Sequence, residues 1–262
     1  MRMLGCVSPP TFGDLTILGA DPVRDGPAIR SRLGVVPQED TLDNELTVRE
    51  NLLVYGRYFG LPRKLINERT DQLLDFVQLT ERGRDQVDPL SGGMKRRLTI
   101  ARSLINDPDI LILDEPTTGL DPQARHIVWD RLFSLKQRGV TLILTTHYMD
   151  EAEQLCDRLV VMDHGTIAAE GAPRELIARY STPEVLEMRF APGTQENAVE
   201  KIKDLSPERM EVTADRILLY AADGDEFLAR VHEAGIEPLT ELVRRSTLED
   251  VFLHLTGRTL ID

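Results

Sequence analysis

Two adjacent carboxylates, Asp114 and Glu115, follow a run of four apolar residues bounded by Pro108 and Pro116. Such a run is typical of a short, fully buried strand inside a parallel sheet. In open α/β sheets the carboxyl ends of the strands form the ligand crevice, so we expect both carboxylates where a metal ion and a reacting group could use them. The alternative is a structural strand followed by an acidic turn.

Other polar residues follow neighbouring strand candidates. Gln38 lies just beyond a predicted strand at 32–36, and His147 lies just beyond one at 140–144. Strand, helix and strand in this order predict a right-handed parallel crossover, which places His147 at the same edge as Glu115. A glutamine in a loop after a strand says almost nothing by itself. A single histidine after a strand is usually structural, so the edge that His147 shares with the two carboxylates is what makes it a candidate.

A glycine pair at a helix start is a further candidate site. Ser91, Gly92 and Gly93 precede a helix predicted over 95–105. Exposed backbone N–H groups, the helix dipole and the serine hydroxyl form a place where an anion could bind. The plainer alternative is an N-cap residue and a flexible turn.

Local patterns predict the elements that carry these residues. Thr47 with Glu50 forms a capping box that starts a two-helix insertion extending to about Gln78. Near the start of the chain we expect a helix at 1–7 and a strand at 15–18. After the carboxylates we expect a helix at 123–137 and a hairpin with strands at 158–162 and 166–170.

Composition limits the classes of protein. The 262 residues have 41% hydrophobic content and a net charge of −13, which argues against nucleic acid as a partner. Two cysteines are ordinary for a reducing compartment, and no apolar run approaches the roughly 18 residues that cross a bilayer. We therefore expect a cytoplasmic chain. After Tyr180, 17 acidic residues face nine basic ones, which indicates a boundary between domains at 1–180 and 181–262.

The region after Tyr180 predicts a small α+β domain of the ferredoxin-like type. Its expected elements are a strand at 184–190, a helix at 195–205, two strands within 210–222, a helix at 226–234 and a strand at 239–244. A last helix over 246–255 has Glu249 at the capping-box position. The residues offer no catalytic group here, so a packing role is expected.

Five motifs together resemble those of an ATP-binding cassette (ABC) transporter ATPase. They look like its Q-loop, signature, Walker B, D-loop and switch histidine, and they are Gln38, Leu90–Met94, Ile110–Glu115, Gly119–Pro122 and Thr146–His147. All occur in the family's order. The amino-acid sequences of these motifs are similar to those of the drug-resistance (daunorubicin-type) and nodulation-factor exporter ATPases. The resemblance implies a P-loop NTPase-like parallel sheet flanked by helices, with a helical subdomain at about 45–105.

The resemblance also implies roles for the residues at the sheet edge. Asp114 would hold Mg²⁺, mostly through water, and Glu115 would orient or deprotonate the water that attacks the γ-phosphate of ATP. Gln38 would complete the metal and water shell. His147 would contact the γ-phosphate and sense its loss.

In the family, two ATPase subunits enclose two ATP molecules. Ser91, Gly92 and Gly93 would then close over the nucleotide of a second subunit, and Asp121 would support the interface. The residues from Gln38 to His147 include what a homodimer would need.

A membrane partner is likewise implied by the family. The resemblance predicts an ABC-2-type permease subunit, with this chain peripheral on the inner face of the cell membrane. Tyr55, Tyr58 and Phe59 are candidates for the contact with the permease, unless they belong to the core. Cassette proteins that act on ribosomes or DNA are the competing class, but they typically carry two cassettes or long coiled-coil insertions, which this sequence lacks.

One motif departs from the family pattern. The 262 residues contain no G-x-x-x-x-G-K-[ST] phosphate loop, and the upstream aromatic contact to adenine is missing too. We favour an N-terminally truncated chain, and we expect it to bind ATP weakly when alone. The alternative is a degenerate, catalytically silent ABC module with an interaction or regulatory role.

Overall fold

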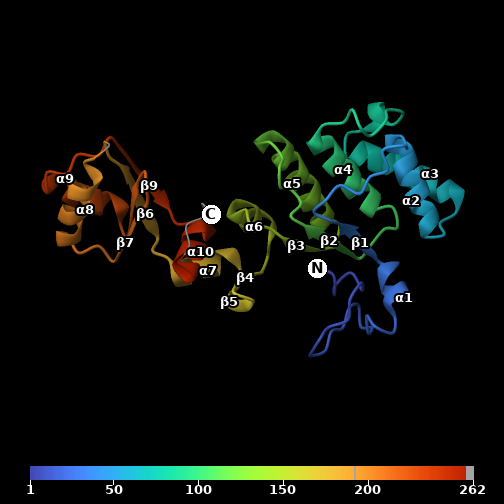
Figure 1. Cartoon of the computed structure of the whole chain (residues 1–262), viewed down its shortest axis with the longest axis horizontal. Helices are drawn as coiled ribbons and strands as arrows, with labels where there is room; N and C mark the ends of the chain where they lie inside the picture. Colours follow the sequence, from blue (N-terminus) through green and yellow to red (C-terminus); the bar gives the residue numbers. More distant parts are fainter. Residues whose placement is uncertain (192, 258–262) are drawn as a thin grey trace. The chain divides into compact units, whose positions relative to one another are not determined.

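The computed structural model describes residues 1–191 and 193–257, and the chain divides into two compact units, Met1–His147 and Tyr148–Asp262. Figure 1 shows the order of the elements along the chain. None of the helices in the described part is long and apolar enough to cross a membrane.

A three-stranded parallel sheet forms the centre of the first unit, as the sequence predicted. The strands β1 (Leu33–Val36), β2 (Ile110–Asp114) and β3 (Thr141–Thr145) lie in the order β1-β2-β3 (Figure 1). The three central residues of β2 are buried, whereas those of the end strand β3 are half-buried. The buried apolar run therefore predicted the middle strand correctly.

Helices flank this sheet, and the second and third of them form the predicted two-helix insertion. They are α1 (Gly26–Arg30), α2 (Val48–Tyr58), α3 (Arg63–Phe76), the short 3₁₀ helix η1 (Thr80–Arg82), α4 (Gly92–Ser103) and α5 (Pro122–Gln137). The capping box of Thr47 and Glu50 is present at the start of α2. Val48 and Leu52 of α2, with Leu74 of α3, belong to one buried apolar cluster, which holds the helical region together.

Glycine allows α4 to approach the sheet closely. A Cβ atom at Gly34 of β1 would lie 2.4 Å from the carbonyl oxygen of Ser103 at the end of α4. Real Cβ atoms do not approach backbone oxygens so closely, so this position accepts no larger residue without movement. The contact fixes α4 against the strand that leads to Gln38.

Two predictions for the start of the chain are wrong. Residues 1–7 form a single turn, in which the N–H group of Gly5 donates to the carbonyl of Met1, instead of a helix. The expected strand at 15–18 is reduced to one bridge between Ile17 and Ala20. Leu18 and the glycine after it have positive φ angles, so the backbone reverses there and cannot extend.

The second unit begins with α6 (Met149–Leu155), the antiparallel hairpin of β4 (Leu159–Asp163) and β5 (Thr166–Gly171), and α7 (Pro173–Tyr180). The hairpin was predicted and is confirmed. A buried apolar cluster contains residues of α6, both hairpin strands, α7 and the last helix, α10 (Leu248–Thr256). The end of the chain therefore packs against the beginning of this unit.

The ferredoxin-like arrangement is confirmed in the rest of the second unit. Its elements are β6 (Glu184–Arg189), α8 (Gln195–Asp204), β7 (Arg209–Val212), β8 (Ile217–Ala221), α9 (Gly224–Glu233) and β9 (Thr240–Arg245). The strands form an antiparallel sheet in the order β7-β8-β6-β9. One face of the sheet packs on α8 and α9 in a common apolar core. The boundary proposed near Tyr180 stays a prediction.

The capping of α10 differs from the prediction by one residue. Thr247 is the N-cap, and Asp250, not Glu249, is the acidic partner in the capping box. Asp250 is also bound by Arg244 of β9, so a tertiary contact selects the register of this cap.

Candidate functional site

The carboxyl ends of the three parallel strands meet at one edge of the sheet. Asp114 ends β2 and lies opposite Thr145, which ends β3. Gln38 follows β1 by two residues, and His147 follows β3 by two. The structure therefore places Gln38, Asp114, Glu115 and His147 together at this edge.

Three side chains reach the same carboxylate oxygen of Glu115. The amide Nε2 of Gln38 and the hydroxyl of Thr118 each donate to Oε2 at 3.0 Å, and Nδ1 of His147 lies 3.5 Å from that atom. The side chain of Glu115 is 28% exposed. A carboxylate that is fixed in place and still open to solvent can accept a hydrogen bond or a proton from water.

The backbone at Glu115 is strained. Its φ angle is +45°, in the left-handed region that side chains other than glycine seldom adopt. The N–H group of Glu115 donates to the carbonyl of Thr145 at 3.0 Å, and its own carbonyl accepts from the N–H group of Thr118 at 3.3 Å. Strain of this kind costs about 1–3 kcal/mol and is concentrated at functional sites.

Asp114 is held by Thr145, which the sequence places at the same sheet edge without giving it a role. The hydroxyl of Thr145 donates a hydrogen bond to Oδ1 of Asp114. Thr145 and Thr118 lack a distinctive pattern in the sequence, because threonine is common at strand ends and in turns. The only available signal was that Thr145 ends the strand paired with β2.

The oxygen atoms at the sheet edge are of the types that Mg²⁺ binds. Asp114 and Glu115 offer carboxylate oxygens, and Gln38 offers an amide oxygen, all ligands of the hard type that Mg²⁺ takes. In the described part of the chain, no three His, Cys, Asp or Glu side chains form a group that could hold a metal ion.

The signature residues lie at the start of α4. Ser91 is the N-cap, and its hydroxyl accepts a hydrogen bond from the N–H group of Met94 at 3.3 Å. A Cβ atom at Gly93 would lie 2.8 Å from the Cβ of Ala124 in α5, whereas one at Gly92 would meet nothing within 4 Å. Packing thus explains Gly93, while Gly92 borders open space. Binding of nucleotide by these residues stays a prediction.

Asp121 has a local structural role. It is the N-cap of α5, and its carboxylate accepts a hydrogen bond from the N–H group of Ala124 at 2.9 Å. Because Ala124 also faces Gly93, the starts of α4 and α5 lie side by side. The predicted interface role of Asp121 stays a prediction.

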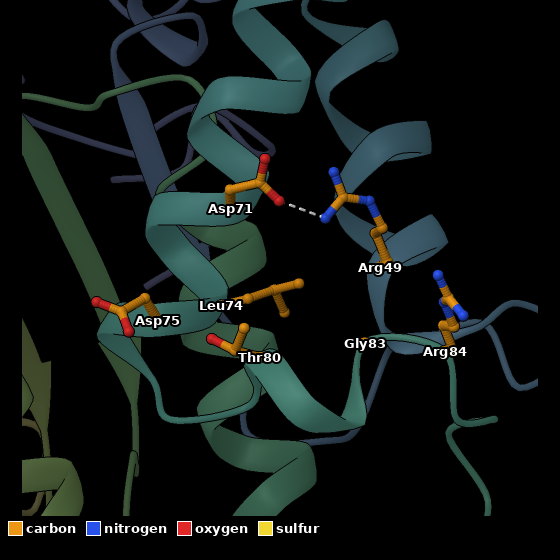
Figure 2. Close-up of a pocket in the computed structure, with 7 residues that line it drawn as sticks. All are labelled: Arg49, Asp71, Leu74, Asp75, Thr80, Gly83 and Arg84. Carbon is orange, nitrogen blue, oxygen red and sulfur yellow. Dashed lines mark hydrogen bonds and ion pairs between the residues drawn. The ribbon is translucent and has the colours of Figure 1, made fainter.

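A separate shallow pocket of about 430 Å³ lies in the helical region. Figure 2 shows its lining by α2, α3 and the segment that follows η1, with Arg49 directed toward Asp71. Nη1 of Arg49 lies 2.5 Å from Oδ1 of Asp71. The remaining lining residues are Leu74, Asp75, Thr80, Gly83 and Arg84.

Two family models match the chain. One, described as ABC transporter, matches residues 1–118, and one, described as the C-terminal domain of the nodulation factor export protein NodI, matches residues 196–257. Solved structures agree with the first match. The cbiO1 protein of Clostridium perfringens, part of the ABC transporter complex cbiONQ, is 29% identical with a TM-score of 0.62 over 68% of this chain and 73% of that one.

An ATP-binding cassette solved as a dimer bound to ADP and Pi is 25% identical, with a TM-score of 0.59 over 65% of this chain and 78% of that one. Curated relatives match almost the whole chain. The Nod factor export ATP-binding protein I of Rhizobium sp. (strain N33) is 49% identical over 99% of this chain and 84% of the relative. The protein of that name from Paraburkholderia xenovorans is 47% identical over 100% of this chain and 84% of the relative. The chain therefore belongs to the ATP-binding proteins of ABC transporters, a family that hydrolyses ATP.

Proposed function

We propose that this chain is the ATP-hydrolysing subunit of an exporter and that Glu115 is its catalytic base. The observation that supports the assignment is the convergence of Gln38 and His147 on one oxygen of Glu115. These side chains come from loops after two different strands, and polar groups that converge at strand ends are the usual setting for ligand chemistry.

Each residue at the sheet edge has a distinct task in this proposal. Glu115 accepts a hydrogen bond or proton from the water that attacks the γ-phosphate. Gln38 fixes the carboxylate through its amide nitrogen. His147, whose side chain is 52% exposed, is available to the γ-phosphate. Asp114 and Gln38 would hold Mg²⁺, which supplies positive charge beside the phosphate oxygens when it is bound.

We also propose a homodimer in which Ser91, Gly92 and Gly93 contact the nucleotide of the other subunit. Gly92 borders open space at the start of α4, where backbone N–H groups and the helix dipole favour an anion. Asp121 caps the adjacent helix and would lie at the same interface. The solved cassette that is 25% identical is itself a dimer bound to ADP and Pi, which supports this arrangement.

The transport partner in this proposal is a separate ABC-2-type permease, contacted from the inner face of the cell membrane. The helical region offers two features for the contact. Tyr58 is 78% exposed and stacks edge-on against Tyr55, and the pocket in Figure 2 presents paired charges. The relatives' name, Nod factor export ATP-binding protein I, supports export as the direction and a Nod factor as the cargo.

In this proposal the 262-residue chain binds ATP only weakly. Its 262 residues include no G-x-x-x-x-G-K-[ST] loop, so they supply neither the backbone donors nor the lysine that hold the β- and γ-phosphates. Glu115 and its neighbours face the reacting end of the nucleotide but contribute little binding. We expect a Kd for ATP weaker than about 1 mM.

Two measurements test the proposal. Calorimetry of ATP with Mg²⁺ against the 262-residue chain tests the affinity, and tight binding would contradict that part. The chain is then extended at its N-terminus by a strand and a G-x-x-x-x-G-K-[ST] loop, and its ATPase activity is compared with that of the same chain carrying Glu115→Gln. We expect kcat to fall by about 10²–10⁴-fold with ATP binding retained.

The control for this assay is Glu68→Gln, on the exposed side of α3, which should leave kcat unchanged. Equal activity of Glu115→Gln and the parent chain would remove Glu115 as the base. An extended chain that binds ATP without hydrolysing it would instead favour the silent, regulatory module.

A further inference from the structure

We propose that Arg96 is a positioning residue for ATP hydrolysis, because its guanidinium group fixes both loops that carry the reacting side chains. Arg96 lies in α4, five residues after Ser91. The inference rests on the proposed function, which gives Gln38 and Glu115 their roles. Arg96 itself touches main-chain atoms of those loops and acts through them.

The guanidinium group donates to carbonyl oxygens at the exits of two adjacent strands. At the exit of β2, Nε donates to Pro116 at 2.6 Å, and Nη2 donates to Asp114 at 2.8 Å and to Glu115 at 3.0 Å. At the exit of β1, Nη1 donates to Pro37 at 2.5 Å and to Gln38 at 3.5 Å. One side chain therefore ties the Gln38 loop to the Glu115 loop.

These two loops need such a bridge for a physical reason. The carbonyl oxygens of 37–38 and 114–116 all lie within hydrogen-bond distance of this one guanidinium group, and they repel one another because they carry the same partial charge. Arginine presents five N–H donors in a planar fork, so it can satisfy both groups at once. Lysine carries a similar charge but donates from a single nitrogen atom, so it cannot span the same set of acceptors.

The bridge also supports the strained turn at Glu115. That residue has a φ angle of +45°, and its carbonyl accepts from Arg96 as well as from the N–H group of Thr118. Strained backbone persists only where its surroundings hold it in place. Loss of the guanidinium group should therefore release the turn and, with it, the contact between Glu115 Oε2 and Gln38 Nε2.

The neighbouring arginine gives a matched control. Arg97 lies on the same helix but points to another part of the helical region, where its Nη1 donates to the carbonyl of Val77 at 2.8 Å. Arg96→Gln and Arg97→Gln both remove one positive charge and one half-buried guanidinium group from α4. Only the first removes the bridge between the strand exits.

The test follows hydrogen exchange and NMR signals of the 262-residue chain without nucleotide. In Arg96→Gln we expect exchange of the N–H groups of Glu115 and Thr118 to accelerate roughly tenfold or more. The side-chain amide signals of Gln38, assigned by their loss in Gln38→Ala, should shift toward those of a free amide. Arg97→Gln should leave these signals in place, and the β6 amides of the second unit should not change in either variant.

A second variant separates bridging from charge. Arg96→Lys should retain protection in one loop and lose it in the other, and it also serves if Arg96→Gln does not fold. Unchanged exchange at Glu115 and Thr118 in the Arg96 variants, equal changes in Arg97→Gln, or full protection of both loops by lysine would each overturn the proposal. Because the test uses no ATP, failure of the ATPase assignment would leave its result standing.

Discussion

Two carboxylates, one in each unit of the chain, have opposite surroundings. Asp250 at the start of α10 is fully buried, and it accepts hydrogen bonds from Arg244 at 2.7 and 2.9 Å, from the N–H group of Thr247 at 2.8 Å and from the hydroxyl of Tyr220 at 3.2 Å. Glu115 is partly exposed, sits on strained backbone and has a histidine at 3.5 Å.

This difference separates a structural carboxylate from a reactive one. An acid whose oxygen atoms are saturated by donors and hidden from water stabilises the fold but cannot reach a substrate or an attacking water. An acid with positioned donors and access to solvent adds little to stability and remains available to water and substrate. Substitutions in the two units should therefore affect different properties.

Removal of Asp250 should give the largest loss of stability. Asp250→Ala removes the two short hydrogen bonds of the half-buried Arg244, which keeps a longer contact with Glu187 at 3.8 Å, and it removes the capping box of α10, so we expect a cost of roughly 3–5 kcal/mol. Hydrogen exchange of the β8 amides measures it. Asp215→Ala, which removes an exposed acid from the turn between β7 and β8, should leave exchange nearly unchanged. Equal effects of the two variants would place Asp250 among ordinary surface acids.

Substitutions of the two signature glycines should differ in their cost to stability, because only Gly93 is packed against another helix. Gly93→Ala brings a methyl group within 2.8 Å of Ala124, and we expect it to destabilise the first unit by about 1–3 kcal/mol. Gly92→Ala meets nothing within 4 Å and should cost less. Urea unfolding, followed by the fluorescence of the single tryptophan, Trp129 in α5, reports this unit. A larger cost at Gly92 would contradict the packing of α4 against α5.

Low pH should reduce the folding stability of the second unit, because the carboxylate of Asp250 becomes protonated. Burial tends to raise the pKa of Asp250, but hydrogen bonds from Arg244 and the main chain of Thr247 outweigh it, and the pKa lies below the usual value. The ionised carboxylate therefore stabilises fully above the unfolded pKa of about 3.9, and this contribution is lost as pH falls through the lowered folded pKa. Exchange of the β8 amides from about pH 5 to about pH 2 should show the loss.

Asp250→Asn provides the comparison for the acid titration. Because asparagine does not titrate in this range, the stability of this variant should depend less steeply on pH than that of the parent chain. Parallel curves for the two proteins would show that a different acid causes the loss.

Removal of Glu115 should have the smallest effect on stability. Glu115→Ala retains the strained backbone and removes a partly exposed carboxylate, so we expect the free energy of unfolding to change by no more than about 0.5 kcal/mol. Unfolding followed by Trp129 fluorescence measures it. A loss as large as that of Asp250→Ala would make Glu115 a structural acid and would undermine the comparison.

Sequence patterns correctly predicted the elements that are determined by neighbouring residues in the chain. The buried run before Asp114, the capping box at Thr47 and the order of elements after Tyr180 all led to the observed strands and helices. The prediction for the last helix failed because a tertiary contact determines the register of its cap. Thr247 and Asp250 form the box at α10 because Arg244 binds Asp250, and the sequence spacing alone allowed Glu249 equally well.

The candidate site was predicted less completely than the fold. Strand order was enough to place His147 beside Glu115, whereas Gln38 was assigned to the site only through the family resemblance. Arg96 could not be found in this way, because its partners are carbonyl oxygens, which every residue has, and they lie up to 59 positions away in the chain. Thr145 was hidden for a similar reason, since its hydroxyl gains its role only from the register of β3 with β2.

The half-buried end strand β3 has a consequence for assembly. An end strand presents main-chain N–H and C=O groups along its outer side, where another extended segment can add to the sheet. Its central residues Leu142, Ile143 and Leu144 would gain apolar cover from such an addition. A segment that added in the parallel direction would bring its own carboxyl end beside Asp114 and His147, so a new loop could enter the site without any rearrangement of β1, β2 or β3.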